Sequence, residues 1–151
     1  MKKLLLLALF CLPLLAFSQT KPYLTLADAQ RISDAAEAKA KAEGWNVVIA
    51  ILDDGGHLIS LRKMDGVQIG SVEVAQAKAK SAVFFKRSTK IFEDAMKGEG
   101  GSRIATLPNA VGVEGGLPIF KDGIIVGAIG ISGVTSAQDG IIAQAGIDAY
   151  Q

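Results

Sequence analysis

Two segments of this chain are apolar on both of their alternating sets of side chains. The segment 45–53, WNVVIAILD, is rich in β-branched residues, and the segment 124–131, IIVGAIGI, repeats the pattern. Such strands are typical of a sheet that is buried on both faces. The chain must therefore cover a sheet from both sides, with its own helices or with another copy. Because a few short helices leave part of such a sheet bare, we expect a homo-oligomer.

The remaining periodicities predict helices around two hairpins. A helix is expected to follow Thr25, whose capping partner is Asp28, and Gly44 ends it. Further helices are expected from Ser71, from Ser88–Thr89 and from Ser136. Strands at 111–120 and 124–132 flank an Asp122-Gly123 turn, which favours type I′ geometry. The order α-ββ-α-ββ-α indicates an α+β fold with an antiparallel sheet flanked by helices.

The first 18 residues have the three parts of a secretory signal peptide. Lys2 and Lys3 precede an apolar run, and Ala16-Phe17-Ser18 offers a cleavage site before Gln19. Removal leaves a single domain, 19–151, with 14 basic and 15 acidic residues and no cysteine, because Cys11 leaves with the signal. The apolar run is too short for a membrane span. A periplasmic or secreted protein without disulfides is expected.

Composition and spacing exclude several classes of partner. The near-neutral charge and the absence of a basic cluster argue against nucleic acid. The sequence has no histidine pair and no carboxylate cluster of the kind that would predict a structural metal site. Gly127, Gly130 and Gly133 lie along a hairpin strand rather than between a strand and a helix, which argues against a nucleotide cradle. These glycines indicate close approach by a ligand or by a packed helix, and Gly133 is a candidate anion nest.

An ordered set of short motifs resembles the GlcG/HbpS family, also called the haem-degrading domain. The resemblance spans residues 25–150. Its motifs are Asp53-x-Gly55-Gly56, Arg62-x-Met64-Asp65-Gly66, Ala75-x-x-Lys78-Ala79, Gly115-Gly116-x-Pro118, Asp122-Gly123, Gly127-Ala-Ile-Gly130-x-Ser132-Gly133, Gln138-Asp139 and Ala145-Gly146.

The resemblance implies a profilin-like sandwich and a homo-oligomer. It also implies an apolar pocket that binds, and in some members slowly degrades, haem. Other members accompany glycolate or diol metabolism. The expected function is thus a secreted protein that binds haem or a similar planar, carboxylate-bearing ligand. The alternative is an enzyme or accessory protein of small organic-acid or cofactor metabolism, in which Arg62 holds substrate and Asp65 or Lys78 transfers a proton.

Candidate ligand-binding residues follow from these motifs. We expect a pocket where the turn at 62–66, the helix start at Ser71 and the strand 127–133 converge; its candidate residues are Arg62, Met64, Asp65, Ser71, Gly130 and Gly133. Arg62 could clamp a carboxylate, or it could form a structural ion pair with Asp65 or Asp53. His57 is the candidate haem axial ligand, although a histidine after Gly55-Gly56 also suits a solvated turn.

Cleavage of the signal peptide has a direct test. Protein recovered from the cell envelope or the medium is expected to begin at Gln19, because the cleavage site precedes that residue. Intact-mass measurement checks this, and a mass that still includes Met1 to Ser18 contradicts it.

Overall fold

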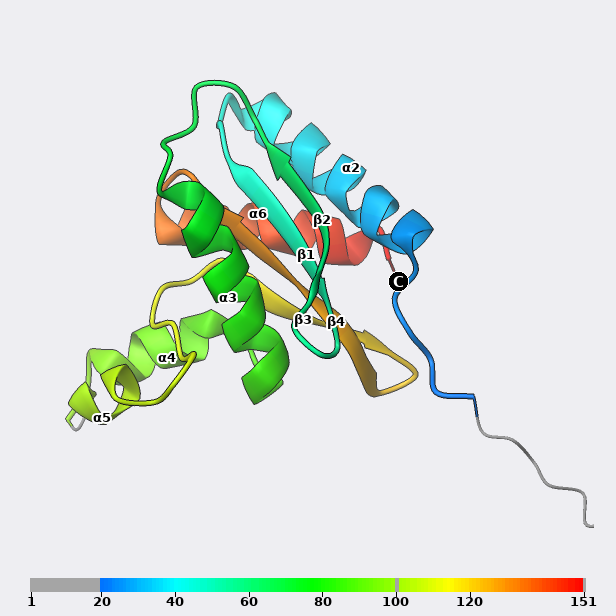
Figure 1. The fold of residues 1–151 in the computed structure, drawn as a ribbon. Helices are drawn as coiled ribbons and strands as arrows, with labels where there is room; N and C mark the ends of the chain where they lie inside the picture. Colours follow the sequence, from blue (N-terminus) through cyan, green and yellow to red (C-terminus); the bar gives the residue numbers. More distant parts are fainter. Residues whose placement is uncertain (1–19, 100, 151) are drawn as a thin grey trace, which may run out of the picture.

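A four-stranded antiparallel sheet forms the centre of the molecule, with strand order β2-β1-β4-β3 (Figure 1). The computed structural model describes residues 20–99 and 101–150. The expected signal peptide therefore lies outside the described residues. Helices and strands follow along the chain as α2 (Leu26–Glu43), β1 (Val48–Asp53), β2 (Leu58–Lys63), α3 (Ser71–Phe85), α4 (Thr89–Met96), α5 (Ser102–Ala105), β3 (Gly116–Lys121), β4 (Ile124–Ser132) and α6 (Ser136–Asp148).

The predicted α+β class, antiparallel sheet and order of the main elements are confirmed. The structure adds α5 within a segment that looked irregular, and β3 begins at Gly116 rather than at 111. Two predicted caps are wrong by one residue: Gly70 precedes α3, and Thr135 caps α6 together with Gln138. The Thr25–Asp28 capping box is present as predicted. The Thr135 hydroxyl, one position before Ser136, caps α6, whereas α3 has no side-chain cap; sequence alone leaves a shift of one residue open.

The two hairpins form as their turn residues predict. Asp122 and Gly123 have φ of 51° and 75°, which is the left-handed pair that a type I′ turn needs. Pro118 lies in β3, an edge strand of the sheet, where a missing amide donor is tolerated. β1 and β4 are the two central strands, and their residues between 48 and 53 and between 127 and 132 pair in register.

Helices of this chain cover both faces of the sheet. In Figure 1, α2 and α6 lie on one face and α3 on the other. The first face holds the larger core, which includes Ile49, Ile51 and Ile129. The second face packs the alanines of α3 against Val48, Ala50 and Leu52. Both apolar sets of β1 are thus buried within one copy, so this strand supplies no bare face for a subunit contact.

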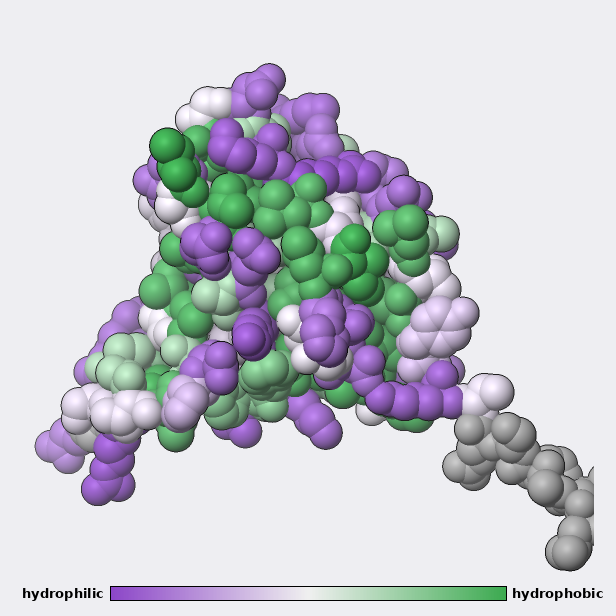
Figure 2. Space-filling model, in the orientation of Figure 1, coloured by the Kyte–Doolittle hydropathy of each residue, from purple (hydrophilic) through white to green (hydrophobic). Residues whose placement is uncertain are grey.

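Exposed apolar side chains lie at several other places on the surface. Around β2 and α3 they include Leu58, Ile69, Val74 and Phe84, with exposed fractions from 40% to 87%. Figure 2 shows apolar surface gathered on this side of the molecule, between polar patches. Homo-oligomerisation stays a prediction, and these residues replace the central strands as its basis.

The strand glycines let α3 approach the sheet. A Cβ on Gly130 would overlap the carbonyl oxygen of Ala75 and crowd Ala79 on α3. A Cβ on Gly133 would overlap the carbonyl oxygen of Asn46. Of the two alternatives for these glycines, close packing within the chain is the one that the structure contains, and backbone fills the space that a flat ligand would need.

Replacing Gly130 by alanine tests this close packing. Gly130→Ala is expected to lower the free energy of unfolding by about 2 kcal/mol or more, because the helix backbone has to move. Gly70→Ala is the control, since its Cβ would meet nothing within 4 Å, and its effect is expected to stay below about 0.5 kcal/mol. Urea unfolding measures both, and equal effects would contradict the packing argument.

Candidate functional site

A cleft lies between the C-terminal half of α2 and the end of β2. Its volume is about 430 Å³, within the range of small-molecule sites. Three of the predicted ligand-binding residues, Arg62, Met64 and Asp65, meet in it. The complete lining is Glu37, Lys41, Asn46, Arg62, Lys63, Met64 and Asp65.

Antiparallel pairing decides which side chains reach this cleft. Arg62 pairs with Ile49, whose side chain packs in the core beneath α2, so Arg62 lies on the α2 face. The amide of Met64 donates to the carbonyl of Val47 at 3.1 Å, which extends the pairing beyond β2. Met64 packs partly against the larger core. A turn follows at Gly66, with φ of 76°.

Arg62 is held by acidic residues of α2. Its Nη1 lies 2.6 Å from Asp34 Oδ1 and 3.0 Å from Glu37 Oε2. Although burial opposes the charge, these two carboxylates raise the pKa of Arg62. Arg62 therefore forms a structural ion pair, as one of the two alternatives predicted. Its partners are acids of α2, however, and not the expected Asp65 or Asp53. Sequence could not choose among these acids, because the choice depends on which helix covers β2.

Two lysines supply the other positive charges of the cleft. Lys41 Nζ lies 2.5 Å from Glu37 Oε1. The hydrogen bond from Lys41, followed by the one from Arg62, lowers the pKa of Glu37. Glu37 thus stays ionised near neutral pH and neutralises part of the positive charge. Lys63 forms no ion pair with any residue in 20–99 or 101–150, so it is free to meet an anion.

Ser71 and the strand glycines lie away from the cleft. Ser71 is fully buried, and its Oγ lies 3.1 Å from Ser132 Oγ. α3 covers Gly130, as described above. The expected convergence of the 62–66 turn, Ser71 and the glycine strand into one pocket is therefore wrong. Sheet pairing places Arg62 on the α2 face, whereas Ser71 is the first residue of α3, on the opposite face.

The predicted anion nest near Gly133 holds a carboxylate of this chain. Asp139 Oδ1 accepts a hydrogen bond from the Val134 amide at 3.3 Å, and the Gly133 amide also acts on this carboxylate. The nest thus serves packing and leaves no room for an external anion.

His57 lies at the tip of the β1–β2 hairpin. Its side chain is 83% exposed, and its Nδ1 lies 3.3 Å from Asp53. It does not line the cleft that holds Met64. This position matches the solvated-turn interpretation, and a role as haem ligand stays a prediction without a surrounding pocket.

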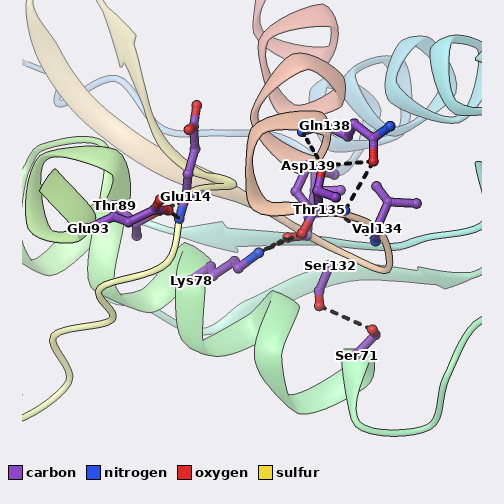
Figure 3. A network of polar contacts seen from close by, with 12 residues as sticks. Ser71, Lys78, Thr89, Glu93, Glu114, Ser132, Val134, Thr135, Gln138 and Asp139 are labelled. Carbon is purple, nitrogen blue, oxygen red and sulfur yellow. Dashed lines mark hydrogen bonds and ion pairs between the residues drawn. The ribbon is translucent and has the colours of Figure 1, made fainter. Parts of the chain in front are cut away.

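A buried ion pair joins α3 to α6 on the other side of the molecule (Figure 3). Lys78 Nζ lies 2.7 Å from Asp139 Oδ2 and donates to the carbonyl of Ile131 at 3.0 Å. The two side chains are 1% and 2% exposed. Burial raises the pKa of Asp139, while Lys78 and the backbone amides oppose that rise. Lys78 does not line the cleft with Arg62 and Asp65, so the expected enzyme-like grouping of these three is not assembled.

Sequence reasoning missed the part that α2 contributes to the cleft. Asp34, Glu37 and Lys41 recur at three- and four-residue spacing, which places them on one helix face. An arginine in the neighbouring strand was the available signal that the acids have a partner.

The buried pair has a testable effect on stability. Asp139→Asn is expected to cost about 3–5 kcal/mol, because it leaves the Lys78 ammonium buried without a counter-charge. Lys78→Met should cost a similar amount at pH 7. The double variant should cost clearly less than the sum of the two.

A lower pH should partly restore the stability of Lys78→Met. Burial raises the pKa of Asp139, so the folded state prefers the protonated carboxyl and loses stability as the pH rises. Urea unfolding at pH 7 and pH 5 measures these effects. Lys90→Met is the control, because the Lys90–Asp94 pair, 2.6 Å apart, is half exposed and its loss should leave the stability nearly unchanged. Additive costs at 78 and 139 would contradict the coupling.

Known proteins share both the sequence pattern and the fold. A family model described as "Haem degrading protein HbpS-like" matches residues 24–148. Protein GlcG of Escherichia coli strain K12 is 39% identical over 114 residues, which covers 76% of this chain and 84% of GlcG. An uncharacterized 15.0 kDa protein from the dhaT-dhaS intergenic region of Citrobacter freundii is 31% identical over 88% of this chain and 96% of its own length.

Solved structures agree with these sequence matches. A double mutant of Streptomyces reticuli HbpS superposes with a TM-score of 0.81 at 25% identity, covering 90% of this chain and 92% of that one. A PduOC:heme complex gives a TM-score of 0.77 at 30% identity, with 85% and 95% covered. On the family match, the sequence identities and the shared fold, the chain belongs to the GlcG/HbpS family of HbpS-like proteins.

Proposed function

We propose that the protein binds haem, or a similar planar ligand with carboxylate groups, in the cleft between α2 and β2. The observation that carries this proposal is that Met64 and Lys63 line one cleft of about 430 Å³. A thioether is one of the side chains that hold haem iron, and an ammonium suits a propionate. The PduOC:heme complex supports the proposal, because a protein of the same fold and 30% identity carries haem.

The cleft suits the propionate edge of haem better than the apolar face of the haem ring. Lys63 and the Asn46 amide can bind carboxylates, while Glu37 and Asp65 keep the walls polar. Met64 is the lining side chain whose sulfur can face iron. When bound, haem would supply a redox-active iron. This chain's residues would orient the propionates and hold the macrocycle. Met64 rather than His57 would hold the iron, because His57 is exposed outside the cleft.

A small organic acid is the second candidate ligand. The walls of the cleft are mostly charged, which suits a small hydrophilic carboxylate, and GlcG is 39% identical to this chain. We also propose that the protein is secreted, because residues 1–18 have the three parts of a signal peptide. None of the helices that the structure describes is both long and apolar enough to pass through a bilayer.

Haemin titration tests the proposed function. Added haemin is expected to give a saturable shift of its main visible band with the purified protein. Met64→Leu should abolish the part of the shift that arises from iron coordination, because leucine keeps the volume but removes the sulfur. Lys63→Gln should weaken binding about two- to fivefold, as for an exposed ion pair.

Two controls separate the contributions. Met96→Leu alters an exposed methionine outside the cleft and should change nothing. Metal-free protoporphyrin should respond to Lys63→Gln but not to Met64→Leu. Haem binding through Met64 would be refuted if the wild-type protein left the haemin spectrum unchanged. It would also be refuted if Met64→Leu gave the same spectral shift as the wild-type protein. Binding of small organic acids at the cleft would then favour the second candidate.

A further inference from the structure

A second cavity lies at the opposite end of α2, where three distant segments meet. Its volume is about 310 Å³. The start of α2, the β3–β4 hairpin and the end of the chain after α6 form its walls. The lining residues are Asp28, Arg31, Phe120, Lys121, Asp122 and Tyr150. None of them lines the cleft around Met64.

We propose that this cavity binds a small aromatic monocarboxylate. The Tyr150 hydroxyl donates a hydrogen bond to the carboxylate, Arg31 and Lys121 attract its charge, and the rings of Phe120 and Tyr150 contact its apolar body. This site is separate from the proposed haem cleft and does not depend on it.

The Tyr150 hydroxyl is the most direct indication of a ligand. Its oxygen is buried, and it has no hydrogen-bond partner within residues 20–99 and 101–150. A buried polar atom without a partner is unfavourable, and such atoms are uncommon in folded proteins. Burial raises the pKa of Tyr150, so the hydroxyl keeps its proton at neutral pH and is available as a donor. The oxygen is closed to solvent in this conformation, so a ligand with an acceptor oxygen would satisfy it once the side chains that cover it move aside.

Arg31 and Lys121 are the two cations of the lining, and their N–H groups can donate to a carboxylate on the ligand. Arg31 Nη2 lies 2.7 Å from Asp28 Oδ1, and Asp28 also binds the amide and hydroxyl of Thr25. Asp28 is therefore already neutralised, while Arg31 keeps other N–H donors on a side chain that is 57% exposed. Lys121 forms no ion pair with another described residue.

Asp122 limits the negative charge that a ligand can bring. It lies on the hairpin turn. Burial and then Asp28 raise the pKa of Tyr150 most, and Asp122 is near enough to raise it further. This acid disfavours phosphates and dicarboxylates, which would bring a second negative charge close to it.

The remaining walls suit a flat apolar body. Phe120 is 44% exposed, although it is a large aromatic side chain on an edge strand. The Tyr150 ring packs partly against the larger core, which fixes its position. Aromatic rings pack favourably against each other, either stacked with an offset or edge to face. The rings of Phe120 and Tyr150 therefore favour an aromatic ligand over an aliphatic one.

Benzoate is the probe for this site, with benzamide as its uncharged match. Amide chemical shifts of ¹⁵N-labelled protein are recorded during titration at fixed ionic strength. Benzoate is expected to shift the amides of Arg31, Lys121 and Tyr150 in a saturable way, and benzamide should bind at least about tenfold more weakly. Tyr150→Phe should weaken benzoate binding about tenfold, as expected for a lost hydrogen bond to a charged group.

Stability separates a binding role of the hydroxyl from a structural one. Tyr150→Phe removes a group without a partner, so the melting temperature of the free protein should stay unchanged or rise. Tyr23→Phe is the matched control, because Tyr23 is 69% exposed and lies outside the cavity, and it should leave both binding and stability unchanged. Arg31→Gln and Lys121→Gln should each weaken benzoate but not benzamide.

Three results would overturn the proposal. They are the absence of benzoate-induced shifts at this cavity, equal binding of benzamide, or a Tyr150→Phe variant that binds normally but melts lower. Met64→Leu and Lys63→Gln should leave benzoate binding intact, so the outcome here is independent of the haemin experiment.

Discussion

The ion pair between Lys78 and Asp139 constrains how the layers of this molecule are assembled. A charged lysine and a charged aspartate, 1% and 2% exposed, are tolerated only when each is paired and hydrogen-bonded. Lys78 comes from α3, on one face of the sheet. Asp139 comes from α6, which belongs to the layer on the other face, and Ile131 on β4 contributes the carbonyl between them (Figure 3). The contact therefore fixes two helices and a central strand in one arrangement.

The close approach of α3 follows from the same arrangement. Alanines on α3 and Gly130 on β4 bring helix and strand backbones together, which aligns Lys78 with the carbonyl of Ile131. The backbone of Gly116 also lies against α3, and its amide donates to Thr89 at 3.0 Å. Because backbone fills the space beside Gly130, no ligand can lie against the glycines of β4. The cleft that holds Arg62 and Met64 forms instead on the α2 side, where the ion pairs of Arg62 with Asp34 and Glu37 join the end of β2 to α2.

Several features of the fold could be predicted from residues alone. Asp122-Gly123 needs positive φ at both positions, and a two-residue hairpin uses just that geometry. The Thr25–Asp28 capping box is local, so its residues predict it without reference to the rest of the chain. The candidate site was only half predicted. Arg62, Met64 and Asp65 are near in sequence and meet in one cleft, but the same turn was expected to meet Ser71 and Gly130, which the sheet holds elsewhere.

The sequence by itself determined the class of the fold, the two hairpins and the requirement that the sheet be covered on both faces. These depend on side-chain periodicity and on turn residues, which act within a few positions of the chain. Only the tertiary structure decided the partners of the charges. It chose Asp34 and Glu37 for Arg62, and Asp139 for Lys78, 61 residues away. Long-range ion pairs depend on which helix covers which strand, and many acids in one sequence satisfy the same local rule.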